Sequence, residues 1–325
     1  MDKLRPIVSR LLKSIAIIAT IIILNFLLIR LAPGDPAAAM AGEAGAADEA
    51  FMAQLREQFG LDRPVYQQLA YYFADIVRFD LGYSYRQREA VVDLILDRLP
   101  ATLLLTISGF IVALGLGILL GVASAMRVGR LADRLISLFA LLFYATPLFW
   151  VGLMAIMLFS VWLGWLPSFG MESVGAGYSG WARTADIAHH LILPAGTLGL
   201  FYVAVYTRLT RASMLEVKDM DFVRTARAKG LRHGLIVRRH ILRNAMLPVI
   251  TFAGIQAGQL VGGAVLTETV FAWPGIGRLA FDALLQRDYP VLLGVFFVTS
   301  VMVVVFNIIT DIAYRIADPR IEVVS

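Results

Sequence analysis

The chain has 325 residues, of which 59% are hydrophobic and only 16% are charged, with a formal net charge of +5; its mean hydropathy is +0.74. Soluble domains have about 25% charged and about 45–50% apolar residues, so this composition excludes an ordinary soluble α/β domain. There is no cysteine, which excludes disulfides, thiolate metal ligands and a cysteine nucleophile. The apolar residues gather in blocks long enough to cross a hydrocarbon layer of about 30 Å as helices. We expect an all-α membrane protein.

Six apolar blocks predict six transmembrane helices. They lie at 12–31, 100–125, 135–162, 191–210, 245–270 and 291–312. The first block follows a basic start, as in a signal peptide, and Ala39-Met40-Ala41 resembles a cleavage site. We prefer a transmembrane helix, because the apolar run is longer than the core of a usual signal peptide and a turn at Leu31–Pro36 follows it.

The distribution of lysine and arginine predicts the orientation of these helices. Basic residues concentrate in four segments that share one side if there are six spans: the N-terminus, 126–134, 208–243 and the C-terminus. The connections on the other side are poor in positive charge, and segment 32–98 has six arginines against eleven acids. Because basic loops are retained in the cytoplasm, we expect both termini of this multi-pass protein to be cytoplasmic. The resemblance described below implies that the membrane is the bacterial cytoplasmic (inner) membrane.

Four parts follow from this pattern. They are the N-terminus and first helix at 1–31, an extracytoplasmic segment at 32–98, a five-helix core at 99–312 and a cytoplasmic tail at 313–325. The external segment is too long for a simple connector, and its stretch 51–79 has amphipathic helical spacing. The apolar side consists of Tyr66, Leu69, Tyr72, Phe73 and Ile76. We expect a small external cap, with a passive lid over the bundle as the alternative; the resemblance described below implies that such a cap helps to dock a substrate-binding protein.

The stretch 224–248 lies between two apolar blocks, yet it is dense in arginine and lysine and contains no acid. The spacing from Lys218 to Gly230 predicts a short helix with Phe222, Ala226 and Gly230 on one face. Gly230 can end this helix, because glycine adopts the left-handed conformation at low cost. Small residues flanked by arginines suit docking into a partner's groove. On physical grounds alone, an interfacial helix attracted to anionic lipid explains the pattern equally well.

Glycines at four-residue spacing predict close helix contacts within the membrane. They are Gly117 and Gly121 in the second block, and Gly254, Gly258 and Gly262 in the fifth. This spacing is compatible with sliding helices and with static packing, and static packing is the commoner role.

Several polar residues fall at membrane depth. The candidates for lining a pathway or bonding between helices are Tyr202, Tyr206, Gln256, Gln259, Glu268, Asn307 and Asp311. For Asn307 and Asp311, which are spaced i, i+4, we favour interhelical bonds, because polar groups in lipid need partners. Glu268 either meets a substrate's amino group or pairs with Arg278, and we favour the pair.

The stretch Asp221–Leu231, followed by Arg239-His240 and Leu247-Pro248, resembles the coupling loop of ABC-importer permeases. The likeness is to the dipeptide/oligopeptide/nickel branch, and within it to the first (B-type) of two permease subunits. Arg224-Thr225-Ala226 replaces the Glu-Ala-Ala of the general importer pattern, as in the peptide branch. Similar stretches cover nearly the whole chain: Leu31–Pro36, Leu55–Pro64, Phe79–Ser84, Arg98–Thr102, Glu268–Gly277, Asp288–Pro290 and Asp318–Arg320.

The resemblance implies a type I ABC importer permease fold with six transmembrane helices. It implies that 218–232 contains the coupling helix, which docks on an ATPase subunit. The residues carried over to that role are Asp221, Phe222, Arg224, Thr225, Ala226, Arg227, Ala228, Lys229, Gly230 and Leu231. The implied partners are a second homologous permease, two ATPase subunits, an extracytoplasmic substrate-binding protein and membrane lipid, and no nucleic acid.

The chain has no G-x-x-x-x-G-K-[ST] phosphate loop. We therefore expect a transport subunit rather than an enzyme, with no catalytic residues, cofactor or metal of its own, and with ATP and Mg on the partner ATPases. The resemblance predicts import of di- or oligopeptides by alternating access, with glutathione, opines, oligosaccharides or nickel as alternatives.

Two functions of other classes are disfavoured. An ion-coupled secondary transporter usually has more spans and shows inverted repeats, neither of which is visible here. An intramembrane enzyme needs a catalytic set, whereas the histidine pair His189-His190 stands at a span entrance without a metalloprotease motif or a nucleophile–base set.

Overall fold

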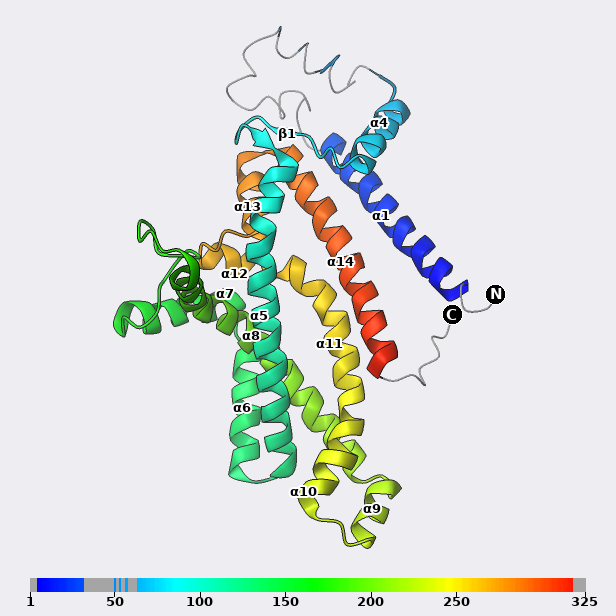
Figure 1. Ribbon diagram of the computed structural model, residues 1–325, viewed down its shortest axis with the longest axis vertical. Helices are drawn as coiled ribbons and strands as arrows, with labels where there is room; N and C mark the ends of the chain where they lie inside the picture. Colours follow the sequence, from blue (N-terminus) through cyan, green and yellow to red (C-terminus); the bar gives the residue numbers. More distant parts are fainter. Residues whose placement is uncertain (1–4, 32–49, 51–52, 54–55, 58–62, 318–325) are drawn as a thin grey trace. The chain divides into compact units, whose positions relative to one another are not determined.

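The computed structural model describes residues 5–31, 50, 53, 56–57 and 63–317. Nearly all of this is helical, which confirms the expected fold class, and the one sheet in the described part is a short hairpin (Figure 1). The chain divides into two compact units. The first comprises 1–102, 274–305 and 322–325, and the second comprises 103–273 and 306–321. Two helices, α5 (Val91–Met126) and α14 (Tyr289–Ala317), contribute to both units.

The first unit is built around helices from both ends of the chain. Its other elements are α1 (Arg5–Leu31), α4 (Val65–Val77), β1 (Tyr83–Ser84), β2 (Glu89–Ala90) and α13 (Ile276–Gln286). Ile22 of α1, Ile76 of α4 and Phe297 of α14 form one buried cluster. The amphipathic stretch of the external segment thus includes a helix, α4, although Tyr66 on its predicted apolar side is 71% exposed.

Two polar contacts join distant segments of the first unit, one between the hairpin and the start of α14 and one between α13 and α5. The Ser84 hydroxyl donates to the Asp288 carboxylate, and both residues are buried. The amide of Ile276, which begins α13, donates to Thr102 Oγ1 at 2.8 Å. Several of the stretches that carry the family resemblance therefore hold this unit together.

The second unit contains the remaining helices. They are α6 (Leu131–Ala145), α7 (Leu148–Ala155), the π-helix η1 (Ile156–Trp162), α8 (Gly180–Lys218), α9 (Asp221–Ala228), α10 (His233–Ile236), the π-helix η2 (Val237–Leu242), α11 (Arg243–Gly263) and α12 (Val265–Val270). The long helix α8 is central and packs against α6, α7 and α11.

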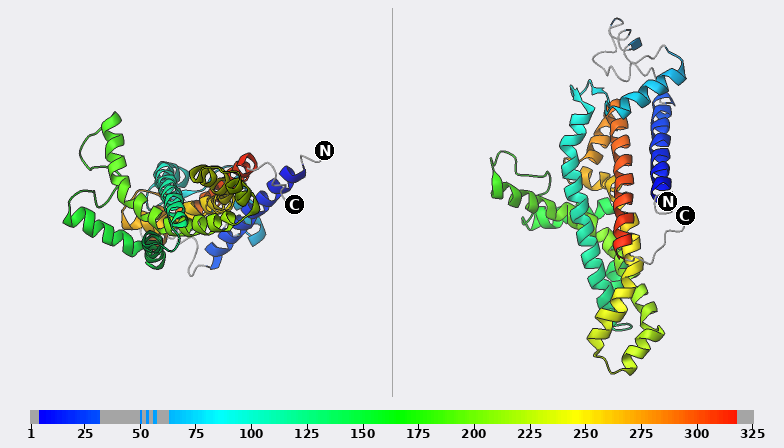
Figure 2. Two further views of the ribbon diagram at one scale, coloured as in Figure 1. Left: turned by 90° about the horizontal axis from the view of Figure 1, so that it is seen from below. Right: turned by 45° about the vertical axis from the view of Figure 1, so that its right-hand side comes forward.

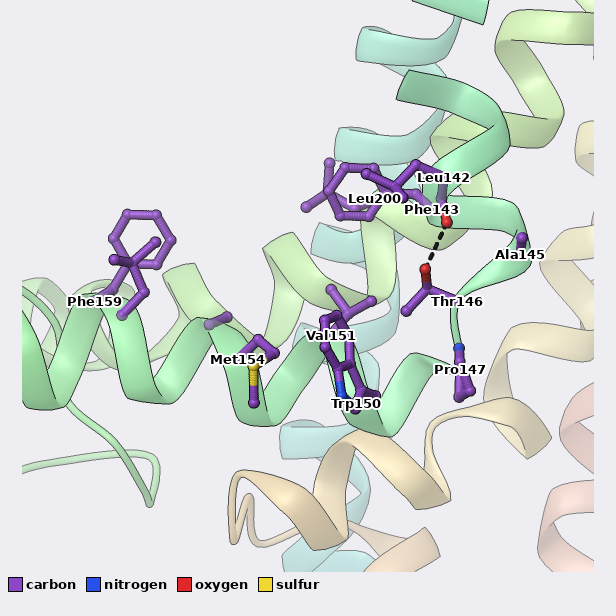
Figure 3. A pocket seen from close by; sticks show the side chains of 12 residues that line it. Leu142, Phe143, Ala145, Thr146, Pro147, Trp150, Val151, Met154, Phe159 and Leu200 are labelled. Atoms are coloured by element: carbon purple, nitrogen blue, oxygen red, sulfur yellow. Dashed lines mark hydrogen bonds between the residues drawn. The ribbon is translucent and has the colours of Figure 1, made fainter. Parts of the chain in front are cut away.

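The expected span 135–162 is not one continuous helix, which corrects the sequence prediction. The helices α6 and α7–η1 meet at an angle of 106°. Pro147 explains the break: it supplies no amide hydrogen, and Thr146 before it is extended, with φ −91° and ψ 135°. The Thr146 hydroxyl donates to the Leu142 carbonyl at 2.7 Å (Figure 3). Beside the bend lies an apolar groove of about 590 Å³, lined on one side by Trp150 and Met154.

The observed helices also shift some predicted boundaries. In the described residues, three helices are long and apolar enough to cross a membrane, or four if the bent pair counts as one span. The expected fifth span is interrupted at Ala264, between α11 and α12. Because α5 already begins at Val91 and α14 continues to Ala317, the expected segments 32–98 and 313–325 each include part of a helix. The total of six spans stays a prediction.

Candidate functional site

The short helix expected around 218–230 is present as α9 (Figure 1). Helix α8 ends at Lys218, and α9 begins at Asp221, whose carboxylate suits the positive end of the helix dipole. Arg227 lies in the last turn, where its charge is also favourable. Gly230 follows with φ +73°, and its amide donates to the Arg227 carbonyl at 2.9 Å. The left-handed glycine predicted to stop the helix therefore does so, two residues beyond its end.

One face of α9 turns inward. Val223 is fully buried and Ala226 is only 5% exposed. Both belong to a cluster with Met214 and Val217 of α8. Ala226 was expected on the same docking face as Phe222, and this expectation is wrong: helical spacing groups residues on a face but does not say whether that face meets solvent or the protein's own core.

The outward face of α9 and the following turn remains exposed. Phe222 is 40% exposed and Leu231 is 37% exposed, and they stand beside several charged and small residues. The exposed candidates for ATPase coupling are Asp221, Phe222, Arg224, Thr225, Arg227, Ala228, Lys229, Gly230 and Leu231. Basic side chains beside two apolar ones suit a partner groove that combines acids with an apolar pocket.

The cluster beneath α9 connects it to the ends of three long helices. Besides the residues of α8, it includes Ala125 at the end of α5, Ile236 and Ile241 of the connection after α9, and Ala245 at the start of α11. These segments gather at one end of the second unit (Figure 2). The inner face of α9 is therefore packed against the ends of α5, α8 and α11 in one cluster.

A network of hydrogen bonds around Asp133 lies at the same end of the second unit, and it was not predicted from the sequence. The Asp133 carboxylate accepts from Arg211 Nε at 2.8 Å and from Arg211 Nη2 at 3.0 Å. It also accepts from the Ser124 hydroxyl and from the Gly129 amide, the latter at 3.0 Å. Asp133 thereby ties the connection between α5 and α6 to α8. The available signal was an acid within the otherwise basic loop 126–134.

The polar candidates of α8 and α11 separate into two environments. The side chain of Gln256 lies near the Tyr202 hydroxyl. Phe201 lies edge-on to Tyr202 and is stacked with Tyr144 of α6. Tyr206 is fully buried, which contradicts a position along an open pathway in this state.

Tyr206 instead forms part of the packing between helices. It contacts the ring of Phe110 from α5 and the ring of Phe252 from α11. Its burial therefore joins three helices of the second unit.

The remaining polar candidates lie on α11, α12 and α14 and have different surroundings. Glu268 of α12 is fully buried, whereas Asn307 of α14 is exposed. The interhelical bond expected for Asn307 stays a prediction. The bond between α14 and α11 is made by Thr310, whose hydroxyl donates to the Gly254 carbonyl at 3.1 Å. Arg278 Nε lies 3.8 Å from Asp282, and a pair between Arg278 and Glu268 stays a prediction. The side chains of Gln259 and Asp311 lie outside the described part.

The close helix contact expected at Gly117 and Gly121 is present between α5 and α8. A Cβ built on Gly121 falls 2.5 Å from Thr210 Cβ and 2.8 Å from the Thr207 carbonyl oxygen, and one built on Gly117 collides with Tyr206. Gly109 and Gly199, which the sequence reasoning did not select, make similar contacts across the same interface. Positions 258 and 262 lie in the part of α11 whose side-chain environment is not described.

The sequence matches a family of membrane transport components. Residues 117–323 match the family described as the binding-protein-dependent transport system inner membrane component. Residues 3–106 match the N-terminal model of the same kind of component. The chain belongs to this family. It is therefore a multi-pass inner-membrane permease subunit of a binding-protein-dependent transport system.

Relatives of known description are similar over nearly their full length. The di/tripeptide transport system permease protein DppB of Pseudomonas aeruginosa is 42% identical over 316 residues, covering 92% of this chain and 93% of the relative. The oligopeptide transport system permease protein AppB of Bacillus subtilis is 42% identical over 317 residues, covering 97% and 98%. Both are similar to this permease along nearly its whole length.

Solved structures support the fold. An inward-facing structure of the MetNI methionine ABC transporter aligns with a TM-score of 0.55 at 19% identity, covering 70% of this chain and 97% of that one. An amino acid ABC transporter aligns with a TM-score of 0.53 at 16% identity, covering 69% and 94%. At these identities the likeness concerns the fold alone, and it confirms the importer permease fold that the resemblance implied.

Proposed function

We propose that this permease is the first of two membrane subunits of an ATP-driven importer that carries di- or oligopeptides into the cytoplasm. The substrate class rests on relatives with 42% identity over nearly the whole chain, which are described as di/tripeptide and oligopeptide permeases. The expected partners are a second permease, two ATPase subunits and an external substrate-binding protein. ATP and Mg would be bound by the ATPase subunits.

The observation that carries the coupling role is the position of α9. Its inner face is anchored on the cluster shared by α5, α8 and α11, and its outer face presents Phe222 and the neighbouring basic residues. A helix anchored in this way acts as a lever. Movement of ATPase subunits docked on the outer face would displace the ends of three membrane helices together. Alternating access requires a bistable bundle of this kind, whose two states are biased from outside.

The orientation is part of the proposal. The basic connections at 126–134 and 208–243 would face the cytoplasm, together with both termini. The absence of cysteine makes this simple to test, because every introduced cysteine is unique. Val174, in the connection before α8, is fully exposed, and Arg232 after α9 is also exposed. In intact cells an impermeant maleimide should label Val174→Cys and should label Arg232→Cys only after the membrane is opened.

Reconstitution tests the transport function. The complete complex, in vesicles with ATP enclosed on the ATPase side, should accumulate labelled di- to pentapeptides only when the binding protein is present. Glutathione, opines, oligosaccharides and nickel are tested in parallel as the alternative cargoes. Accumulation of one of these without peptides would keep the importer and overturn the peptide assignment. Accumulation that follows an ion gradient without ATP would overturn the importer itself.

A further inference from the structure

Arg208 and Arg211 stand one turn apart on α8, but their side chains have different surroundings. Arg211 is held by Asp133 near the start of α6. Arg208 instead places its guanidinium carbon 4.2 Å from the centre of the Tyr144 ring, near the other end of α6. Tyr144 lies about three helical turns beyond Asp133. The two arginines therefore direct their charges to separate levels of the α6–α8 pair.

The direction of the Arg208 side chain follows from helix geometry. The helices α6 and α8 are antiparallel, because Asp133 meets Arg211 at one end and Tyr144 stacks on Phe201 at the other. Helical side chains lean toward the N-terminus of their own helix. Tyr144 and Arg208 consequently lean toward each other, and the guanidinium points away from the loop end of α8 and into the span. An arginine near a span end usually extends its charge outward to the membrane surface.

This inward guanidinium lacks an ionic partner among the residues that the structure describes. Arg208 is exposed, and in the described ranges no carboxylate forms an ion pair with it, whereas Arg211 beside it has one. The Tyr144 ring offers its electron-rich face, which compensates only part of the charge. An arginine at this depth is costly against lipid, so its side chain is expected to face water, protein or a bound anion.

A row of aromatic and polar groups extends from Arg208. Tyr144 stacks on Phe201 with 6.4 Å between ring centres, and Phe201 lies edge-on to Tyr202 at 5.1 Å. The side chain of Gln256 of α11 lies near the Tyr202 hydroxyl. The row combines ring faces, an amide and one cation, which match the side chains, the peptide groups and the terminal carboxylate of a short peptide.

We propose that Arg208, supported by the ring of Tyr144, binds the C-terminal carboxylate of the peptide during its passage through the membrane. The inference rests on the proposed peptide import and adds a residue for recognition within the permease. The planar guanidinium suits a carboxylate, because it can donate two parallel hydrogen bonds. A lipid phosphate is a poorer fit, since the guanidinium points into the span and not toward the headgroup layer.

The test compares two forms of one peptide. Import is measured in vesicles containing the complete complex and binding protein, with the peptide as its free acid and as its C-terminal amide. In the wild type the free acid should be imported faster than the amide, after correction for the affinity of the binding protein for each form. Arg208→Gln should slow import of the free acid about tenfold and bring the acid-to-amide ratio close to one, because one charged hydrogen-bonding group is lost. Arg208→Lys should give an intermediate ratio.

Arg134→Gln is the matched control. Arg134 is exposed near the start of α6, and its substitution removes the same kind of charge from the same pair of helices, about three turns away from Tyr144. It should leave the acid-to-amide ratio unchanged. Tyr144→Leu should lower the ratio without removing any charge, which provides a second test if Arg208→Gln assembles poorly.

Two results would overturn the inference. If Arg208→Gln and Arg208→Lys slow both peptide forms equally, or release the second permease subunit during purification, Arg208 pairs with an acid of that subunit. If the ratio keeps its wild-type value in Arg208→Gln and Tyr144→Leu, the row does not recognise the carboxylate. Failure of the wild-type complex to import either form would refute the proposed peptide transport itself, and that result requires no variant.

Discussion

Arg211 and Asp133 form a two-pronged ion pair between α8 and α6, with bonds of 2.8 and 3.0 Å. The Asp133 side chain is 7% exposed and that of Arg211 is 31% exposed. Asp133 also accepts from Ser124 and from the Gly129 amide, so its carboxylate has partners on both sides of the turn between α5 and α6. The pair fixes that turn against α8, close to the cluster that carries α9.

We expect Asp133→Asn to destabilise the permease. An amide cannot serve all the donors that surround the carboxylate, and loss of a charged hydrogen bond costs about 1.5–3 kcal/mol, with the lower end expected here because Arg211 is partly exposed. The midpoint of thermal unfolding in detergent measures the effect. Asp282→Asn is the control, because the Arg278–Asp282 contact is 3.8 Å long with both side chains more than a third exposed. If the two substitutions lower the unfolding midpoint equally, the hydrogen bonds of Asp133 stabilise the permease no more than an exposed ion pair does.

Gly121 provides a second prediction, on the interface between α5 and α8. Gly121→Ala places a methyl group 2.8 Å from the Thr207 carbonyl oxygen, which is backbone and cannot rotate away. Forced expansion of a packed interface should destabilise the permease by about 1–3 kcal/mol. Gly115→Ala is the matched control on the same helix, since its methyl group would meet nothing within 4 Å.

Gly115→Ala should be neutral or stabilising by up to about 1 kcal/mol, because alanine favours the helix over glycine. The thermal unfolding temperatures of the two variants test this prediction. If Gly121→Ala unfolds at the same temperature as Gly115→Ala, α5 and α8 are not in tight contact.

The sequence was informative where one local chemical property determines the structure. The conformation of Gly230 and the contacts of Gly121 follow from the absence of a side chain, and both could be predicted. The bend at Pro147 was missed, because apolar composition alone describes a span and gives no weight to a proline near its middle. The Thr-Pro dipeptide was the available signal.

Other features depend on partners far away in the sequence. Asp133 meets Arg211 from another helix, and spacing within one loop cannot identify such a partner. The inward orientation of Ala226 could not be predicted from the sequence either, because the residues that cover it come from α5, α8 and α11. Local periodicity predicted the α9 helix but not which of its faces is buried.

The connection before α8 should respond to pH. Glu172 accepts two hydrogen bonds from Arg183, at 2.7 and 3.3 Å, and these bonds lower the pKa of Glu172 below its ordinary value. Because the folded pKa lies below the unfolded one, the contact is fully present above the usual glutamate value of about 4.3 and is lost as the pH falls through the folded pKa.

Hydrogen exchange of the neighbouring Ser173 amide measures this effect. That amide, on the connection, donates to the carboxylate of Asp186 of α8 at 2.6 Å. Glu172→Gln should exchange faster than the wild type at neutral pH, and the two rates should converge in acid, where the wild-type carboxyl is protonated. Comparing the variant with the wild type at the same pH removes the intrinsic dependence of amide exchange on pH. A difference that stays constant even after acid has protonated the Glu172 carboxyl would show that the charge of Glu172 is not what orders the connection.

The outward face of α9 gives the prediction that separates ATPase docking from lipid binding. Ala228 is exposed, whereas Ala226, two residues earlier, is buried in the protein's own core. Ala228→Trp should leave the unfolding midpoint nearly unchanged, as surface substitutions usually do. If the face docks on an ATPase subunit, the added indole should obstruct the groove, so that the ATPase subunits no longer copurify and peptide no longer stimulates ATP hydrolysis.

Ala226→Trp is the contrasting variant. It should lower the unfolding midpoint through overpacking, by about 1–3 kcal/mol or more, and any loss of ATPase binding would then be secondary. A helix that merely lies on anionic lipid would respond in the opposite way. The larger apolar surface of Ala228→Trp would strengthen its membrane contact and leave ATPase binding intact. Copurification of the ATPase with Ala228→Trp at the wild-type level, together with normal stimulation by peptide, would therefore exclude this face as the coupling surface.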